Sequence, residues 1–453
     1  MYGLSGVCVL VVLWLVVVRA TFLGRFRRDD PESGVSRSNH GNQGGNQGGY
    51  TRIDADVDPE CFMNSSQLIA DNGYIPETHS VTTEDGYILQ IFRVRPKKEK
   101  SPVAFLQHGL TSSSDTFLLN LRSSFPFILH EQGYDVWLGN VRGNIYCMNH
   151  TSLSPQDKEF WDFSFQEMGE IDLPAMVDYV LKVTGQKKIF YTGHSQGTEM
   201  GFLGFSSNPD LASKISLFTA LAPIARISYA KGLIALLKEF VDLEGVLYWL
   251  LGNGQFDPPS EVALYFATKI CPEDALTRGL CETLDALASG FDISNINQTR
   301  YPIYRAHDDQ STSTKDIIHW AQLLRYKRVQ KFDYGSGKAN MARYNQTSPP
   351  LYDISKMRVP TILVAGGNDW LGDTRDVMWL IKTIYPSIVK VLFIDKYNHD
   401  DYVLGMDAPK QVYSPVLEIM GAFVNGSKGY QFLTNSERME RLGTVDLGSL
   451  WEF

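Results

Sequence analysis

Apolar and polar positions change their spacing repeatedly along the chain between residues 87 and 394. Short runs of consecutive apolar residues bounded by turn-forming residues are typical of strands buried on both faces. Two segments, 167–184 and 198–205, instead carry apolar residues at helical spacing. The strand-like runs are residues 87–94, 103–107, 135–139, 187–191, 216–222, 361–365 and 391–394. Strands that alternate with helices in this way predict an α/β fold with a mostly parallel central sheet flanked by helices.

One long stretch, residues 224–344, interrupts this alternation between two predicted strands. Residues 232–251 within it are strongly apolar and have helical character, and residues 317–326 form a further helix candidate. Structureless loops of this length are uncommon inside a compact domain, so the stretch predicts a helical cap or lid over the strand ends. A second helical domain packed elsewhere is the alternative.

The two ends of the chain differ in composition from its middle. Residues 1–20 hold an apolar run and end in small residues, which predicts a secretory signal peptide. No Lys or Arg precedes the run and several Arg residues follow it, so an uncleaved signal anchor is the alternative. Residues 21–56 are polar and rich in Gly, Asn and Gln, which predicts a disordered spacer. The globular domain is therefore expected over residues 57–425, and the tail, 426–453, gives no usable signal.

Net charge and cysteine content argue against a nucleic-acid partner, a metal site and a disulfide-dense scaffold. The 453-residue chain has a formal net charge of −9, which argues against a nucleic-acid partner. Its five cysteines are too few for a disulfide-dense scaffold, and their spacing matches no common metal site. Cys271 and Cys281 are close enough in sequence to bridge a short loop, whereas Cys61 and Cys147 either pair or stay free. Simple burial of all four is the alternative.

Sequons for N-linked glycosylation support entry into the secretory pathway. Each is a candidate site only, since such triplets also arise by chance. The sequon asparagines are Asn64, Asn149, Asn297, Asn345 and Asn425.

A Gly-x-Ser-x-Gly sequence lies between the predicted strand 187–191 and the predicted helix 198–205. It reads Gly193-His194-Ser195-Gln196-Gly197. A sharp strand-to-helix turn strains the serine backbone and exposes its hydroxyl, and it needs residues without side chains two positions to either side. Ser195 is therefore the candidate nucleophile. An ordinary glycine-rich loop is the alternative.

A serine hydroxyl needs a base, and the base needs an acid that orients it. Where this elbow occurs, the acid and then the histidine follow the serine in the chain. Three histidines follow Ser195, and two of them fall in the predicted cap, which leaves His399 as the base. Asp369 comes directly after a predicted strand and is the expected acid. Asp373 is the alternative, although its position better suits the start of the next helix.

Backbone N–H groups must also face the oxyanion that forms during acyl transfer. The residue after the nucleophile, Gln196, supplies one, and Leu110, after the strand that ends at His108-Gly109, is the candidate for the second. Arg142 is expected to be a buried, paired structural cation, and a role in organising this corner of the site is the alternative.

Motifs spread over residues 61–424 resemble the acid lipase family, the animal gastric and lysosomal lipases of the α/β-hydrolase superfamily. The resemblance implies a triad of Ser195, Asp369 and His399, an oxyanion hole from Leu110 and Gln196, and a cap disulfide between Cys271 and Cys281. The stretch 307–311 departs from the usual family wording, which leaves lipid preference open. The matching motifs are Glu84-Asp85-Gly86-Tyr87-Ile88-Leu89, Leu106-Gln107-His108-Gly109-Leu110, Gly139-Asn140-Val141-Arg142-Gly143-Asn144, Asp172-Leu173-Pro174-Ala175, the elbow, His319-Trp320-Ala321-Gln322, Tyr344-Asn345-Gln346, Gly366-Gly367-Asn368-Asp369-Trp370-Leu371 and Tyr397-Asn398-His399.

The function that the resemblance implies is hydrolysis of carboxylic esters of hydrophobic lipids, triacylglycerols or sterol esters, through an acyl-enzyme. We expect a lipid ester substrate at a lipid–water interface or membrane surface, no cofactor or metal, no obligate protein partner, and a lysosomal or secreted location. The alternatives are a lipid carrier on the same fold that does not hydrolyse its cargo, and a thioesterase or peptidase with the same triad.

Overall fold

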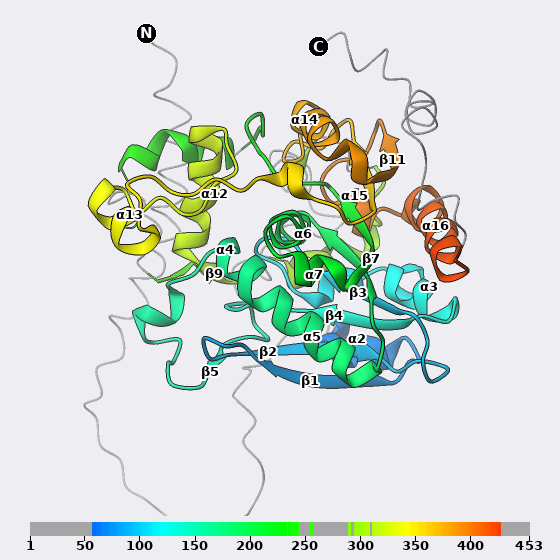
Figure 1. Cartoon of the computed structure of the whole chain (residues 1–453). Coiled ribbons are helices and arrows are strands. Elements are labelled where there is room, and N and C mark those ends of the chain that lie inside the picture. The colour runs from blue at the N-terminus through cyan, green and yellow to red at the C-terminus, as the bar shows by residue number, and fades with distance from the viewer. Residues whose placement is uncertain are drawn as a thin grey trace, which may run out of the picture.

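A computed structural model describes residues 57–232, 234–243, 248, 254–256, 289–290, 294–308 and 310–426 (Figure 1). Four predictions lie outside these residues: the signal peptide or anchor, the 21–56 spacer, the Cys271–Cys281 disulfide and nearly all of the 426–453 tail. Within the described part of the chain, Cys61 and Cys147 are both buried and free, so they do not pair with each other. No helix in that part has the length and apolar composition needed to span a membrane.

The centre of the molecule is a sheet of nine strands in the order β1-β2-β4-β3-β6-β7-β10-β11, with β5 paired to β2. Strands β4, β3, β6, β7, β10 and β11 run parallel, and β2 is antiparallel to β1, β4 and β5. The seven strands expected from the apolar runs are all present, which confirms the mostly parallel α/β sheet. The bounds are β1 Pro76–Thr82, β2 Tyr87–Val94, β3 Val103–Gln107, β4 Asp135–Gly139, β5 Asn149–His150, β6 Ile189–His194, β7 Ile215–Leu221, β10 Thr361–Gly366 and β11 Ile388–Ile394, with β8 Gln255–Phe256 and β9 Thr312–Ser313 in a separate pair.

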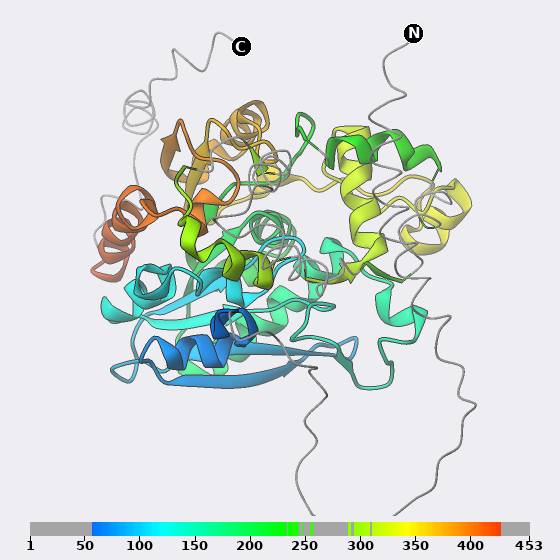
Figure 2. The same cartoon turned by 180° about the vertical axis from the view of Figure 1, so that it is seen from behind.

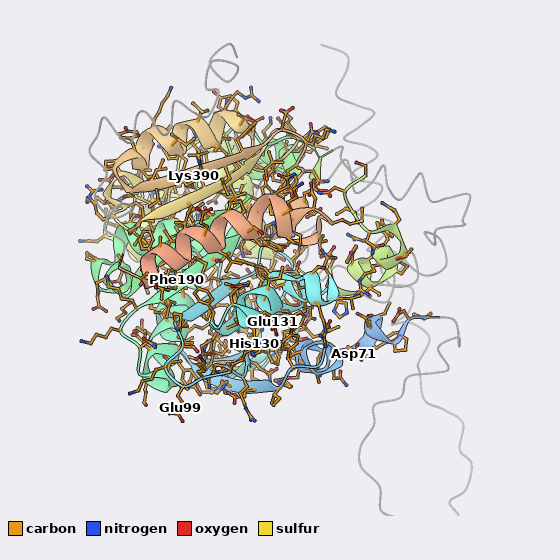
Figure 3. All side chains as sticks on the ribbon, turned by 90° about the vertical axis from the view of Figure 1, so that its right-hand side faces the viewer. Asp71, Glu99, His130, Glu131, Phe190 and Lys390 are labelled. Atoms are coloured by element: carbon orange, nitrogen blue, oxygen red, sulfur yellow. The ribbon has the colours of Figure 1, made fainter. Side chains whose placement is uncertain are left out.

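Helices cover both faces of the sheet. Successive residues of a strand point to opposite sides, and in these continuous apolar strands both faces therefore carry apolar side chains that need cover. Phe105 and Tyr191 join one buried cluster, with α5 (Leu173–Thr184), α6 (Gln196–Ser207) and α14 (Thr374–Ile384). Their neighbours in sequence, Leu106 and Phe190, join the opposite cluster, with α3 (Phe125–Glu131), α15 (Asp401–Leu404) and α16 (Ser414–Val424). Figure 1 looks onto α5 and α6, and Figure 2 shows the molecule from behind. Figure 3 gives the side view, in which side chains fill the space between the layers.

Several shorter elements complete the description. The remaining α-helices are α2 Ser65–Asp71, α4 Phe165–Glu167, α7 Pro209–Ser213, α11 Tyr301–His307, α12 Thr314–Tyr326 and α13 Gly337–Tyr344. The 3₁₀- or π-helical turns are η1 Pro59–Phe62, η2 Ser114–Phe117, η3 Leu121–Ser123, η4 Lys158–Trp161, η5 Met168–Asp172, η6 Ile234–Leu243, η8 Gln298–Arg300, η9 Ile354–Lys356, η10 Tyr385–Ser387 and η11 Pro409–Tyr413. The amphipathic segment predicted at 167–184 thus folds as η5 followed by α5.

The chain between β7 and β10 packs against the sheet domain through its described helices. Trp320 and Leu324 of α12 belong to the same buried cluster as α5 and α6. Ile303 and Tyr304 of α11 belong to the cluster on the other face. These two helices of the insertion therefore extend both hydrophobic cores of the sheet.

Arg142 follows β4 and is 1% exposed. Its guanidinium contacts the Asp172 carboxylate at 2.6 Å and the Asp85 carboxylate at 2.6 Å, and it lies 4.0 Å from the centre of the Tyr87 ring. A buried cation is tolerated only with such partners, because transfer from water is otherwise very unfavourable. The geometry agrees with a structural role for Arg142, since it ties the loop after β4 to η5 and to the turn before β2.

We expect Arg142→Met to lower the free energy of unfolding by about 3–5 kcal/mol, because it leaves buried Asp172 without its counter-charge. Chemical denaturation measures the change. Arg95→Met is the matched control: the Arg95 side chain is 54% exposed and pairs with Glu77 at 2.8 Å, so its loss should be below about 1 kcal/mol. Equal losses in the two variants would contradict the structural role.

Candidate active site

Ser195 lies in a tight turn between β6 and α6, with φ +53° and ψ −119°. The flanking glycines are required by close packing. A β-carbon on Gly193 would lie 2.5 Å from the carbonyl carbon of Gly197, and one on Gly197 would lie 2.4 Å from the carbonyl oxygen of Gln107. No side chain fits at either distance, so the helix approaches the sheet only because these positions are glycine. The strained turn raises Ser195 at the carboxyl end of β6.

Three segments that follow the parallel strands β6, β10 and β11 bring the predicted serine, aspartate and histidine together. The imidazole Nε2 of His399, after β11, lies 2.8 Å from Ser195 Oγ. Its Nδ1 lies 2.9 Å from Asp369 Oδ1, after β10. All three side chains are buried or nearly so: Ser195 is 9% exposed, His399 4% and Asp369 3%. The arrangement forms a continuous hydrogen-bonded chain from hydroxyl to carboxylate, at the sheet edge where sites in such folds occur.

The Asp369 carboxylate is held by more than the imidazole. Oδ1 also accepts hydrogen bonds from the backbone N–H groups of Leu371 at 3.0 Å and Gly372 at 2.7 Å, and Oδ2 accepts from Tyr402 Oη at 3.2 Å. Burial raises the pKa of Asp369, but the charge and hydrogen bond of His399, with the two N–H groups, outweigh it, so the pKa lies below its ordinary value. The aspartate is therefore ionised and fixed in orientation.

The pKa of His399 moves the other way. Burial lowers it, but the charge and hydrogen bond of Asp369 have the larger combined effect, so the pKa lies above its ordinary value. A raised pKa makes the imidazole a stronger proton acceptor toward the Ser195 hydroxyl.

Sequence reasoning missed two supports of this arrangement. His194 lies within the elbow, and its Nε2–H donates to the carbonyl of His399 at 2.9 Å. Burial and the charge of His399 lower the pKa of His194 to about 4, so its ring is neutral and acts as a fixed donor. The second support is Tyr402, three residues after the histidine. Both stand beside predicted site residues in sequence, but only the fold shows which way their side chains point.

The two predicted oxyanion donors belong to two different segments that pass beside Ser195. Gln196 is the first residue of α6, so no carbonyl of its own helix can accept its backbone N–H. Leu110 follows Gly109, where an added β-carbon would lie 3.0 Å from Ser195 Cβ. The loop after β3 therefore passes close to the nucleophile. Trp320 of α12 donates through Nε1 to the Gln196 side-chain oxygen at 2.7 Å, which links the insertion to this turn.

The aspartate and the two histidines that were not chosen as acid or base of the candidate triad have other hydrogen-bond partners. Asp373 accepts from the backbone N–H of Arg375 at 2.9 Å and caps α14, as its position suggested. His307 contacts Asp115 at 3.1 Å. His319 is buried in α12, where Nδ1 lies 3.0 Å from Ser164 Oγ.

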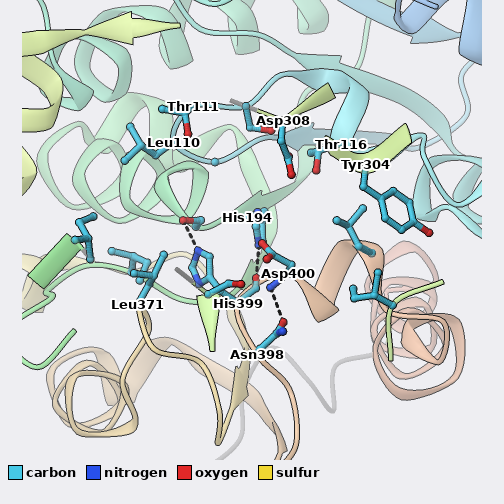
Figure 4. Close-up of a pocket in the computed structure, with 18 of the residues that line it drawn as sticks. Leu110, Thr111, Thr116, His194, Tyr304, Asp308, Leu371, Asn398, His399 and Asp400 are labelled. Atoms are coloured by element: carbon cyan, nitrogen blue, oxygen red, sulfur yellow. Dashed lines mark hydrogen bonds between the residues drawn. The ribbon is translucent and has the colours of Figure 1, made fainter. Parts of the chain in front are cut away.

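A cavity of about 260 Å³ opens beside Ser195 and His399. Leu110 lines it, together with residues of the chain between β7 and β10 such as Ile227 and Trp320 (Figure 4). Among the described residues, no cluster of His, Cys, Asp or Glu has the arrangement of a metal site. The surroundings of Ser195, the candidate nucleophile, therefore combine a hydrogen-bonded polar cluster with a space able to receive a small organic group.

Comparisons with known proteins agree with this geometry. Residues 65–121 match the model of the partial α/β-hydrolase lipase region, and residues 102–241 match that of the α/β-hydrolase fold. Gastric triacylglycerol lipase of Mus musculus is 42% identical over 80% of this chain and 92% of its own length. The chain belongs to the gastric and lysosomal acid lipase family. Two further relatives are lipase member K of Homo sapiens (39% identical, 84% and 96% covered) and lysosomal acid lipase/cholesteryl ester hydrolase of Rattus norvegicus (40%, 82% and 95%).

Solved structures confirm the α/β-hydrolase fold of this acid lipase family member. A crystal structure of a Sulfolobus solfataricus protein assigned as a lipase matches with a TM-score of 0.52 at 16% sequence identity. The match covers 77% of this chain and 94% of the other. At this identity the likeness concerns the fold alone.

A buried acid lies in the helix that follows the nucleophile. Glu199 of α6 is 0% exposed, and neither carboxylate oxygen has a hydrogen-bond partner in the part of the chain that the structure describes. Burial, with the nearby charge of Asp316, raises the pKa of Glu199 well above its ordinary value. Burial also raises the pKa of Asp316 to about 7. In the folded protein, the Glu199 carboxyl therefore stays protonated over a wide range of pH.

The turn geometry predicts that Gly197→Ala lowers kcat/KM for a soluble ester by about 10²-fold or more, because relief of the overlap with Gln107 displaces the nucleophile. Steady-state assays with p-nitrophenyl butyrate measure it. Gly421→Ala in α16 is the control, since an added β-carbon there meets no atom within 4 Å. It should leave activity unchanged and stabilise the helix by about 0.5–1 kcal/mol. Unchanged activity in Gly197→Ala would refute the close-packing argument.

The raised pKa of Glu199 predicts a pH-dependent effect of Glu199→Gln. When the folded pKa of a carboxyl exceeds the unfolded one, stability falls as pH rises from the unfolded value toward the folded value, by about 1.4 kcal/mol per unit. The variant removes this loss. Its Tm relative to the unsubstituted protein should be higher at pH 7.5 than at pH 4.5.

Glu418→Gln, at an exposed position of α16, is the control and should show the same small Tm change at both pH values. A Glu199→Gln effect that does not vary with pH would mean that Glu199 is ionised in the fold.

Proposed function

We propose that the chain hydrolyses carboxylic esters of lipids, with Ser195 as nucleophile, His399 as base and then acid, and Asp369 as the group that orients the imidazole. The main support is the contact of Ser195 Oγ with His399 Nε2 at 2.8 Å beside a cavity, with Asp369 on the other ring nitrogen. Membership of the acid lipase family points to the same chemistry.

The reaction follows from the positions of these groups. Ser195 Oγ attacks the ester carbonyl carbon while its proton passes to His399 Nε2. The oxygen of the tetrahedral intermediate accepts hydrogen bonds from the backbone N–H groups of Leu110 and Gln196. The imidazolium then protonates the leaving alkoxide, which releases the alcohol and leaves the acyl group on Ser195. Water, deprotonated by His399, repeats the sequence and releases the fatty acid.

The proposed substrates are glycerides or sterol esters presented at a lipid–water interface. The relatives are named a gastric triacylglycerol lipase and a lysosomal acid lipase/cholesteryl ester hydrolase. We take residues 224–344 to be the cap of this enzyme, because Ile227, Trp320 and other residues of the stretch line the cavity. An apolar wall beside the nucleophile suits an acyl chain.

The proposed location is the secretory pathway, with lysosomal delivery or secretion. The apolar run at residues 7–18 would act as a cleaved signal peptide. Asn64, Asn149, Asn345 and Asn425 are exposed, and Asn297 is partly exposed, so all five sequons are open to modification. Oligosaccharides at these sites would lie on the surface.

A carrier that binds lipid without hydrolysis would have no need of an ordered serine–histidine contact, so the geometry does not favour it. A thioesterase or peptidase would need the same contact, and the lipase relatives are the reason to prefer lipid esters. A fluorophosphonate probe separates a carrier from all of these enzymes, because it labels only an activated serine.

Ser195→Ala should lower kcat for p-nitrophenyl butyrate by at least about 10⁴-fold, because the members of a triad act as a unit. Mass spectrometry should show fluorophosphonate addition to the unsubstituted protein and none to the variant. Ser112→Ala is the control, because Ser112 lines the same cavity and has no role in the proposed chemistry. Substantial turnover by Ser195→Ala would end the proposal.

A further inference from the structure

The two sides of the cavity beside Ser195 differ in chemical character. One side is formed by apolar side chains, among them Ile224, Ile227 and Leu371. The other side carries polar and charged side chains from α11 and from the loops near it, beside the apolar Ile296 and Leu404. Figure 4 shows Leu371 on one side of His399 and Thr116, Tyr304 and Asp308 on the other. We call this second side, made by Thr116, Tyr301, Tyr304, Arg305 and Asp308, the polar wall.

An ion pair lies in the polar wall. Arg305 Nη1 and Asp308 Oδ2 are 3.3 Å apart, and their side chains are 26% and 31% exposed. Charges at this exposure keep part of their hydration. An apolar group pressed against them removes that water without replacing its hydrogen bonds, which is unfavourable. A group that carries hydroxyls replaces the lost water instead.

Contacts at both ends of α11 hold the polar wall in place. His307, buried at the end of the helix, contacts Asp115 at 3.1 Å and the Glu60 carbonyl at 2.8 Å. At the start of the helix, the Arg300 guanidinium binds both carboxylate oxygens of Glu60, at 3.1 and 2.6 Å. The charged side chains therefore stand on a fixed helix, which favours selection by geometry over adaptation to any ligand.

The chain just after the polar wall contacts the loop that carries a proposed oxyanion donor. The backbone N–H of Gln310 donates to the carbonyl of Thr111 at 2.9 Å, one residue after Leu110. An ester carbonyl held at Ser195 thus has an apolar surface on one side and the polar wall on the other. The acyl chain of the ester matches the apolar surface. The alcohol part of the ester then faces the polar wall.

We propose that the polar wall binds the alcohol part of the ester and makes the enzyme selective for alcohols with free hydroxyl groups. The preferred substrate class is then partial glycerides, mono- and diacylglycerols, over esters of wholly apolar alcohols such as sterols. This inference rests on the proposed ester hydrolysis and narrows its substrate. A site that hydrogen-bonds a hydroxyl discriminates strongly against an analogue that lacks it, because the polar groups of the site then lose their partners.

The test compares two soluble esters with the same acyl group: glycerol monobutyrate, with two free hydroxyls, and cyclohexyl butyrate, with none. The unsubstituted enzyme should show the higher kcat/KM for the glycerol ester. Arg305→Met/Asp308→Leu should lower the ratio of the two kcat/KM values by about tenfold or more. The pair is partly exposed, so the double substitution should leave Tm nearly unchanged.

Two control variants separate selectivity from general damage. Arg305→Lys/Asp308→Glu keeps a charged pair and should keep most of the preference for the glycerol ester. Ile227→Ala, on the apolar side, should change the relative rates of p-nitrophenyl butyrate and octanoate but leave the glycerol-to-cyclohexyl ratio within about twofold.

The outcomes distinguish the two proposals. An unchanged ratio in Arg305→Met/Asp308→Leu, with both esters still hydrolysed, would overturn the role of the polar wall and leave ester hydrolysis intact. A preference of the unsubstituted enzyme for cyclohexyl butyrate would overturn it as well. Absence of hydrolysis of every ester by the unsubstituted protein would overturn the proposed function itself.

Discussion

The close approach of α6 to the strand beside it is the constraint on which the site depends. At Gly197 the helix passes so near the end of β3 that a single β-carbon would overlap the carbonyl of Gln107. Ser195 accordingly adopts a positive φ and stands at the sheet edge. The energy of that strained turn is offset by the packing of α6, whose residues 196–206 are all buried. Neighbouring parallel strands then deliver His399 and Asp369 to the same edge.

The electrostatics of the Ser195–His399 pair depend on the ionised carboxylate of Asp369. Asp369 accepts hydrogen bonds from the imidazole, two backbone N–H groups and Tyr402, so a charge that burial alone would disfavour is retained. Glu199, equally buried but without a partner among the described residues, is neutral instead. These two buried carboxyl groups thus differ in charge because Asp369 has hydrogen-bond donors, whereas Glu199 has none among the described residues.

The sheet and the members of the candidate triad could be predicted from the sequence alone, because both correspond to local sequence patterns. Buried parallel strands are continuous apolar runs, and the elbow has fixed glycine spacing. Edge strand β1 was missed because its seven residues are mostly polar and only Val81 is buried. The support from His194 and Tyr402 and the charged side of the cavity were also missed. They depend on contacts between segments that are separated in the chain, such as α11 and η1, and no local pattern encodes such contacts.

The bond between Trp320 and Gln196 has a consequence for how the enzyme would work. It joins α12 of the insertion to the first residue of α6, while Gln310 is bonded to Thr111 on the opposite loop. Any shift of α12 away from α6 would pull on the turn that carries Gln196, a proposed oxyanion donor. The position of α12 and the geometry of the turn at Ser195 are therefore mechanically coupled through this hydrogen bond.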